Sequence, residues 1–280
     1  MLGHTRGVTH AAPRIVEALA PLRSDPSHAA VLLDIDGTLA PIVRHADDAH
    51  VPEATRTLLI EVAKRYALVA CISGRRATTA RQIVAIGSIA YVGNHGGELL
   101  RAGATQPEVD PELAAWAERV RVFAARAYTP ELQRLRVRSE DKRAIAAFHW
   151  RGAPDESAAE AAVAELATRA RDEGLAVHWG RKVLEVRPPV ALDKGIGVRA
   201  LLDGQPAPAA ARFQAALYVG DDATDVDAFG ALRALVADGL LAHAVCVAVD
   251  SEEAPPELGE QADLAIDGPG GVRALLEALL

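Results

Sequence analysis

The chain has 280 residues, of which 50% are hydrophobic and 24% are charged, a balance typical of soluble globular proteins. Its formal net charge of -8 argues against a nucleic-acid partner, which normally binds a basic surface. No apolar run approaches the roughly 20 residues that span a bilayer, and the N-terminus lacks the hydrophobic run of a secretory signal, so we expect no membrane partner. Cys71 and Cys246 lie in apolar runs without disulfide or zinc spacing, which is consistent with a cytoplasmic protein.

The first 27 residues carry an amphipathic pattern. Apolar side chains recur at helical spacing and form one possible helix face: Ile15, Val16, Leu19 and Leu22. We interpret residues 1–27 as a peripheral N-terminal extension without assigned chemistry.

Short apolar runs then alternate with helical patterns. The pattern predicts buried strands and intervening helices in this order: strand 29–33, helix 53–65, strand 68–73, helix 76–86 and strand 90–96. Strands that alternate with helices are typical of a doubly wound parallel sheet, so we expect an α/β core with a Rossmann-like sheet.

The middle of the chain has a different order of elements. We expect a helix at 111–127, two strands within 135–151, a helix at 155–173 and a hairpin at 175–188. This αββαββ order predicts a separate α+β domain at 108–188, inserted into a core made of residues 28–107 and 189–280.

The core pattern resumes after the insert. The predicted elements are a helix at 194–203, a loop at 205–212, strands at 215–222, 244–249 and 262–267, and a closing helix at 271–280.

Polar residues suited to phosphate chemistry follow several predicted strands. Asp34 and Asp36 follow the first strand, and Gly37 permits a tight turn there. A carboxylate at a strand end is a possible nucleophile that forms an acyl phosphate. An EF-hand is a poor alternative, because Leu39 occupies a ligand position and a strand precedes the loop in place of a helix.

Further acids and one lysine are expected at the same edge of the sheet, because ligands bind beyond the carboxyl ends of strands in open α/β folds. Asp221, Asp222 and Asp225 follow the 215–222 strand. Converging carboxylates repel one another, and a hard cation such as Mg²⁺ relieves that repulsion. Lys194 supplies positive charge at a helix start, although a solvated surface lysine is the alternative. Ser73 is either part of a phosphate cradle or a helix N-cap.

These segments resemble a known family. DIDGT at 34–38, Ser73, Lys194 and GDDATD at 220–225 occur in the order of the four motifs of haloacid-dehalogenase-like phosphatases. VGNHGGEL (92–99), SEDK (139–142), HWR (149–151) and LEVRPPVALDKG (184–195) resemble the trehalose-6-phosphate phosphatases within that superfamily. The resemblance covers roughly residues 28–280.

The resemblance implies roles for individual residues. Asp34 corresponds to the nucleophile, Asp36 to the general acid/base, and Ser73 and Lys194 to groups that hold the phosphoryl oxygens. Mg²⁺ is the implied cofactor, with Asp34, Asp36 through its carbonyl, Asp221 and Asp222 at the metal. Asp222 and the catalytic Asp225 are the implied supporting acids, which orient lysine, water or metal. The implied substrate contacts are Gly37, Gly74, Arg75, Asn94, His95, Glu98, Glu140, Lys142, Arg151, Glu185 and Arg187.

The resemblance predicts hydrolysis of trehalose 6-phosphate through an aspartyl-phosphate, the last step of trehalose biosynthesis, with a small sugar phosphate as the partner. Two alternatives remain: a phosphatase for another sugar phosphate, and a catalytically silent sugar-phosphate sensor. A solvated hairpin turn is the alternative for the charged residues Glu140, Asp141 and Lys142. Val226, Gly97 and Trp150 depart from the residues that are frequent in the family.

Overall fold

The computed structural model describes residues 8–43, 48–203, 213–250 and 254–280. It divides into two compact units, the first made of residues 1–107 and 193–280 and the second of residues 108–192. The sequence-based boundary of the insert, 108–188, is close to that of the second unit. Among the described residues, no helix combines the length and the apolar character needed to cross a bilayer.

The first unit contains a mostly parallel sheet with the strand order β12-β11-β10-β1-β2-β3-β4. β1 lies in the middle and pairs in parallel with both β10 and β2, while β4 runs antiparallel to β3. The strands are β1 (Ala29–Leu33), β2 (Leu68–Ile72), β3 (Ala90–Gly93), β4 (Glu98–Leu100), β10 (Ala215–Gly220), β11 (His243–Asp250) and β12 (Leu264–Asp267). Every residue of β1 and β10 is buried, as expected for strands covered on both faces. The predicted doubly wound α/β core is confirmed.

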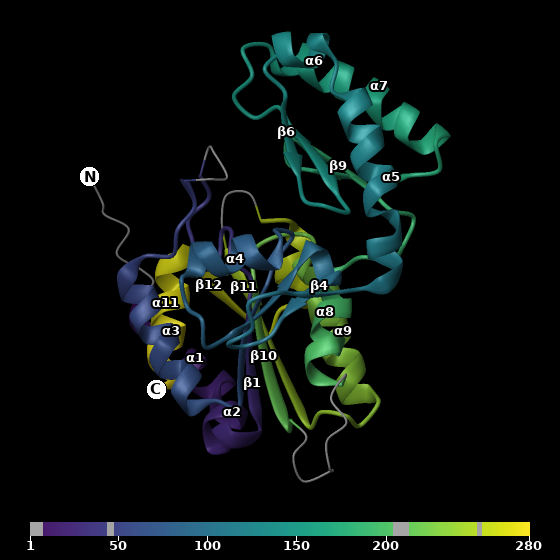
Figure 1. Cartoon of the computed structure of the whole chain (residues 1–280). Helices are drawn as coiled ribbons and strands as arrows, with labels where there is room; N and C mark the ends of the chain where they lie inside the picture. Colours follow the sequence, from purple (N-terminus) through teal and green to yellow (C-terminus); the bar gives the residue numbers. More distant parts are fainter. Residues whose placement is uncertain (1–7, 44–47, 204–212, 251–253) are drawn as a thin grey trace, which may run out of the picture. The chain divides into compact units, whose positions relative to one another are not determined.

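Helices cover both faces of this sheet, and a separate apolar cluster lies under each layer. Figure 1 shows α1, α3 and α11 together on one face and α8 and α9 on the other. The helices are α1 (Val8–Ala18), α2 (Ala20–Ser24), α3 (Glu53–Arg65), α4 (Ala77–Val84), α8 (Lys194–Leu202), α9 (Asp225–Ala237), α10 (Pro256–Gln261) and α11 (Gly268–Leu279), with short 3₁₀ turns η1 (Pro26–His28) and η3 (Asn94–Gly96).

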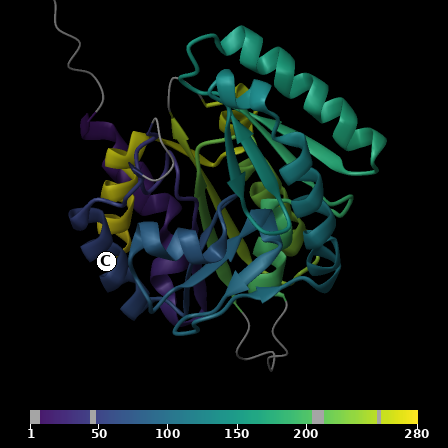
Figure 2. The ribbon, with the colours of Figure 1, turned by 45° about the horizontal axis from the view of Figure 1, so that its top comes forward.

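The second unit is an antiparallel four-stranded sheet, order β6-β7-β9-β8, with helices packed on one face. Its elements are β5 (Glu108–Val109), α5 (Pro111–Ala127), α6 (Pro130–Arg134), β6 (Arg138–Asp141), β7 (Ala146–His149), α7 (Glu156–Asp172), β8 (Ala176–Gly180) and β9 (Val183–Arg187). In Figure 2 the long helix α7, in green-teal, runs along this sheet. The predicted αββαββ order is confirmed, with the short α6 in addition.

The N-terminal segment differs from its predicted role as a peripheral extension. Ile15, Leu19 and Leu22 are buried in the same apolar cluster as β1, so α1 and α2 belong to the core of the first unit. Val16, which we had placed on the apolar face, is 43% exposed. The predicted single helix is broken between α1 and α2. Because the break changes which side chains share a face, the prediction of one continuous apolar face is wrong.

Two other elements differ from the sequence-based assignment. The strand expected at 90–96 ends at Gly93, because Asn94 and His95 adopt positive φ values of 49° and 54°. β4 is too short, at three residues, to be distinguished by its pattern. The loop predicted at 205–212 lies outside the described residues.

Candidate active site

The loop after β1 brings the first carboxylates to the edge of the sheet. Asp34 follows the last residue of β1, and its N–H donates to the carbonyl of Val219 in β10 at 2.9 Å. Gly37 has a φ of +89°, and a Cβ there would lie 2.0 Å from Asp221 Oδ2. Only glycine therefore allows the Asp221 carboxylate to lie against this turn. The Thr38 hydroxyl donates to Asp221 Oδ1 at 3.3 Å.

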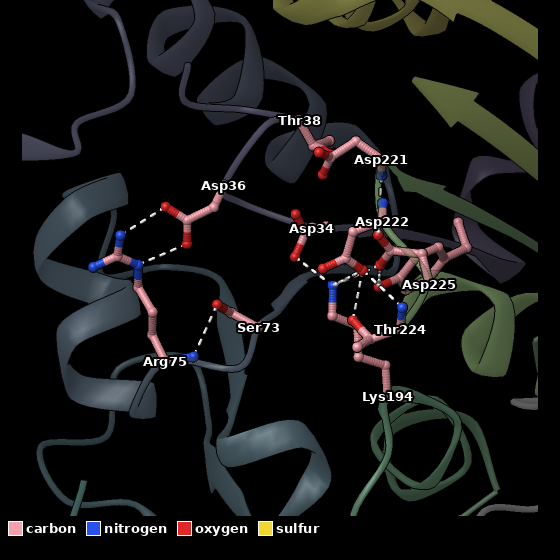
Figure 3. A network of polar contacts seen from close by, with 11 residues as sticks. Asp34, Asp36, Thr38, Ser73, Arg75, Lys194, Asp221, Asp222, Thr224 and Asp225 are labelled. Carbon is pink, nitrogen blue, oxygen red and sulfur yellow. Dashed lines mark hydrogen bonds and ion pairs between the residues drawn. The ribbon is translucent and has the colours of Figure 1, made fainter. Parts of the chain in front are cut away.

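Lys194 joins the two sequence-distant acid motifs. It is the first residue of α8 and only 2% exposed, and its Nζ donates to Asp34 Oδ1 and to Asp225 Oδ1, both at 2.7 Å. Asp222 Oδ1 lies 3.7 Å from the same Nζ. Figure 3 shows the ammonium between these carboxylates. The surface-lysine alternative is wrong, because a buried ammonium needs the paired carboxylates that surround it.

Asp225 anchors the loop after β10. Its Oδ1 accepts hydrogen bonds from Lys194 Nζ and from the Tyr218 hydroxyl, both at 2.7 Å. Its Oδ2 accepts from the backbone N–H groups of Asp221 and Asp222, both at 2.9 Å. Both oxygens are thus engaged by protein donors. This carboxylate fixes the lysine and the loop that presents Asp221.

The electrostatics of the cluster favour a bound cation. Burial raises the pKa of Asp34 well above its ordinary value; Lys194 opposes this shift, while the nearby acids add to it. Burial, followed by the charges of Asp225 and Asp222, raises the pKa of Asp221 to about 7. Burial lowers the pKa of Lys194, but the surrounding carboxylates outweigh it and the net shift is well upward. Like charges held together in a dry site explain these directions.

The carboxylates differ in their suitability as ligands for a cation. Oxygens of Asp34, Asp221 and Asp225 lie within 4.8 Å of one another. Asp225 is the weaker ligand of the three, since its oxygens already accept four hydrogen bonds. The Asp222 side chain is 55% exposed, and its Oδ1 accepts from the N–H and the hydroxyl of Thr224. Asp34 and Asp221 therefore match a hard cation best, in agreement with the oxygen ligands that such ions prefer.

Asp36 and Ser73 lie with Arg75 on the opposite side of Asp34 from the acid loop, as Figure 3 shows. Arg75 Nε and Nη2 donate to Asp36 Oδ2 and Oδ1 at 2.6 and 2.7 Å, a bidentate ion pair. Ser73 Oγ accepts from the Arg75 N–H at 3.1 Å. Ser73 is not the N-cap of α4, because that position belongs to Arg76. Asp36 is held by the arginine that we expected to contact substrate.

The second unit gathers most of the residues predicted to contact the sugar on one face of its sheet. Glu140, Ala147, Glu185 and His178 form one row across the four strands, and paired residues point to the same face. The neighbouring row contains Phe148 and Leu184, which lie in the apolar cluster under the helices. The polar row therefore lies on the face that the helices leave open; we call this the polar cap face.

Ion pairs order the polar cap face. Glu185 accepts from Lys142 Nζ at 2.6 Å and from Arg187 Nε at 2.9 Å, and all three side chains are buried. His149 Nε2 lies 2.9 Å from Glu140 Oε2. A solvated hairpin turn does not describe this arrangement. Arg151 lies in the turn that follows β7.

Some site residues were missed by sequence reasoning. Tyr218 was treated as part of a strand, and only its hydroxyl contact with Asp225 reveals its role. Three residues of the polar cap face were not predicted from the sequence, although each lies on the same side of the sheet as Glu140 or Glu185: Arg138, His149 and His178. Their alternation along the strands was visible in the sequence once the register of the hairpins was assumed.

Asp34, Lys194 and Asp221 thus converge at the strand ends of a doubly wound α/β unit, and an α+β unit is inserted into the chain of that unit. A haloacid dehalogenase-like hydrolase from Bacteroides thetaiotaomicron is similar in structure, with a TM-score of 0.59 and 15% identity, covering 90% of this chain and 100% of that chain. The family model described as trehalose-phosphatase matches residues 32–259, and the chain belongs to that family.

The relatives agree with this assignment. The chain is 37% identical over 204 residues to the trehalose-phosphate phosphatase of Mycobacterium marinum, covering 72% of this chain and 51% of the relative. The same protein of Mycobacterium tuberculosis is 36% identical over 201 residues, covering 71% and 50%. The chain thus spans about half the length of these curated relatives. The C-terminal domain of Candida albicans trehalose-6-phosphate phosphatase shares the fold, with a TM-score of 0.74, 23% identity and 96% of each chain covered.

Proposed function

We propose that this chain hydrolyses trehalose 6-phosphate to trehalose and phosphate, the last step of trehalose biosynthesis. The family membership and the names of the relatives support the substrate. The observation that carries the chemistry is the buried contact of Lys194 with Asp34. It places the lysine ammonium beside a carboxylate at the end of the central strand. That arrangement suits attack on a phosphoryl group, whose charge the lysine stabilises.

The side chains divide the reaction between them. Asp34 attacks phosphorus and forms an aspartyl-phosphate, while Lys194 and Ser73 hold the phosphoryl oxygens. Asp36, with Arg75 bound to one carboxyl oxygen and a proton on the other, gives that proton to the departing sugar oxygen. It then takes one from the water that hydrolyses the intermediate, help typically worth about 10²–10⁴ in rate. Asp225 keeps Lys194 in position. Gly37 and Gly74 let the backbone approach the phosphate, with Arg75 beside them.

Mg²⁺ is the cofactor that we propose for the acidic cluster. Asp34, Asp221 and the carbonyl of Asp36 would hold it, with Asp222 as a supporting acid. The raised pKa values of Asp34 and Asp221 support this proposal, because a cation would offset the repulsion that burial amplifies. When bound, Mg²⁺ supplies charge neutralisation to the phosphoryl oxygens.

Sugar recognition is proposed for the polar cap face. Its buried charges are already paired with one another, so a sugar hydroxyl would meet oriented donors and acceptors with little reorganisation. Glu140, Lys142, Glu185 and Arg187 are the residues that we expect to contact the sugar, together with Arg151. Two buried free thiols, Cys71 and Cys246, support a reducing cytoplasmic location.

The test is release of inorganic phosphate from a panel of sugar phosphates, with Mg²⁺ and with excess chelator. We expect trehalose 6-phosphate to have the highest kcat/KM and the chelator to abolish release. Preference for another sugar phosphate would replace the substrate assignment. Binding of sugar phosphates without any phosphate release would identify a silent sensor and reject the enzyme.

A further inference from the structure

Glu98 connects the loop that holds Ser73 and Arg75 to the turn after β3. It is 3% exposed, and its two carboxylate oxygens serve different segments. Oε2 accepts from the N–H of Ala77, the first residue of α4, at 2.9 Å, and Oε1 accepts from Asn94 Nδ2 at 3.0 Å. Arg76 Nε lies 3.9 Å from Oε1. Glu98 thereby caps α4, whose own N-cap residue provides no side-chain acceptor.

The turn that Glu98 holds has an unusual backbone. Asn94 and His95 both have positive φ, 49° and 54°, a strained conformation for residues other than glycine that persists only where the surroundings impose it. In this conformation both N–H groups point at the preceding loop. The N–H of Asn94 donates to Arg75 O at 2.7 Å, and that of His95 donates to Ser73 O at 3.2 Å.

A close packing contact adds to these backbone bonds. The ring of His95 lies over Gly74, where an added Cβ would come within 2.6 Å of ring atoms. Any larger side chain at Gly74 would force the ring or the loop to move. Three contacts from the 94–95 turn therefore hold the segment from Ser73 to Arg75. They are two backbone hydrogen bonds and the packing of the His95 ring against Gly74.

We infer that Glu98, Asn94 and His95 are positioning residues that set the geometry of the Ser73–Arg75 phosphate cradle, an inference that rests on the proposed function. Asn94 and His95 are buried, and their backbone N–H groups donate to the carbonyls of Arg75 and Ser73 in the loop. Glu98 acts through Asn94 and the start of α4. The three residues therefore govern phosphate affinity without contacting the sugar, which differs from the sugar contacts expected from the resemblance.

The test compares phosphate affinity with metal affinity in Glu98→Gln. The amide matches the carboxylate in shape, but it loses the charge that strengthens both hydrogen bonds and offers one acceptor oxygen in place of two. Calorimetry with inorganic phosphate, in saturating Mg²⁺, should show a dissociation constant raised about tenfold or more, the cost expected when one hydrogen bond to a charged ligand is lost. The affinity for Mg²⁺ alone should stay unchanged, because Asp34 and Asp221 belong to other loops.

Asn94→Gly gives a second and gentler variant. Glycine adopts the positive φ without strain, so the fold should be retained even if Glu98→Gln fails to fold. It removes the side-chain link to Glu98, and phosphate affinity should still fall. The double variant should bind phosphate no more weakly than the weaker-binding of the two single variants, because both substitutions break the same link.

Val272→Ala is the matched control. Val272 is fully buried in α11 and contributes to the core of the first unit, not to the site. If Val272→Ala lowers the melting temperature as much as Glu98→Gln does, it should still bind phosphate with the affinity of the wild type.

Wild-type phosphate affinity in folded Glu98→Gln and Asn94→Gly would overturn the positioning role, and so would additive losses in the double variant. The phosphate measurement needs no turnover. If the wild type bound phosphate but released none from any sugar phosphate, the proposed function would fail, while the comparison of affinities would still decide the role of Glu98.

Discussion

The Nζ of Lys194 lies 2.7 Å from Oδ1 of Asp34, although the two residues are 160 positions apart. The pair is buried, and Asp225 accepts a second hydrogen bond from the same ammonium. The ammonium of Lys194 thus offsets the negative charge of two carboxylates, which follow different strands of the sheet.

Lys194→Met should both destabilise and inactivate the protein. Removing one partner of a buried charged cluster leaves the others uncompensated, which typically costs about 3–5 kcal/mol in the free energy of unfolding. Urea unfolding in chelator measures this loss. Lys64→Met is the matched control, because the Lys64–Glu61 pair is exposed and should change stability by less than about 1 kcal/mol. A Lys194→Met protein as stable as the wild type would contradict the finding.

Asp34→Asn should reduce phosphate release to background while the protein stays folded. The amide oxygen still accepts from Lys194, but it is too weak a nucleophile to form an acyl phosphate. Acid quenching with labelled substrate should trap phosphate on the wild-type protein and none on the variant. Undiminished turnover by Asp34→Asn would refute the assignment of the nucleophile.

Asp221 should contribute stability that the metal-free protein loses as pH rises from 3.8 to about 7, because burial and neighbouring acids raise the pKa of its carboxyl over that range. The folded state holds this proton more tightly than the unfolded chain does, so the free energy of unfolding falls as the proton is lost. The raised pKa of Asp34 acts in the same direction.

Melting temperatures measured across this pH range in chelator should show the decline, and Mg²⁺ should reduce it by taking the place of the protons. Asp221→Asn should flatten the profile in chelator. A melting temperature that rises with pH in the metal-free wild type would show that the acids are not held in the folded state as described.

Arg75→Met should impair the turnover of sugar phosphates more than that of p-nitrophenyl phosphate. The bidentate contact with Arg75 sets the orientation of Asp36, the proposed proton donor. A sugar alkoxide needs that proton to leave, whereas p-nitrophenolate leaves without it. The ratio of kcat values for the two substrates measures the effect. Equal losses for both substrates would assign Arg75 to phosphate binding alone.

Glu185→Leu should destabilise the cap and raise KM for the sugar phosphate, because it leaves Lys142 and Arg187 buried without their shared carboxylate. A double-mutant cycle with Lys142→Met should recover part of the lost stability. Unfolding curves and KM provide the two measurements. Independent effects of the two substitutions would mean that the pair is not coupled.

The order of elements in the core and the identity of the strand-end acids could be predicted from the residues alone. Apolar runs such as 29–33 are buried on both faces, and that burial leaves a local signal in each strand. The motif residues Asp34, Lys194 and Asp221 could be found because they directly follow such elements. The N-terminal helices could not be placed in the core, since periodicity does not reveal which surface covers an apolar face.

The separate roles of the acids depend on contacts that form only in the folded protein. Asp225 was predicted as a supporting acid, and its oxygens accept from Lys194, Tyr218 and two backbone N–H groups, contacts that no local pattern predicts. The pairing of Asp36 with Arg75 and the link from Glu98 to Asn94 and α4 likewise depend on loops from neighbouring strands. Hydrogen bonds between such loops are set by the packing of the sheet edge, and the local sequence carries no periodic signal for them.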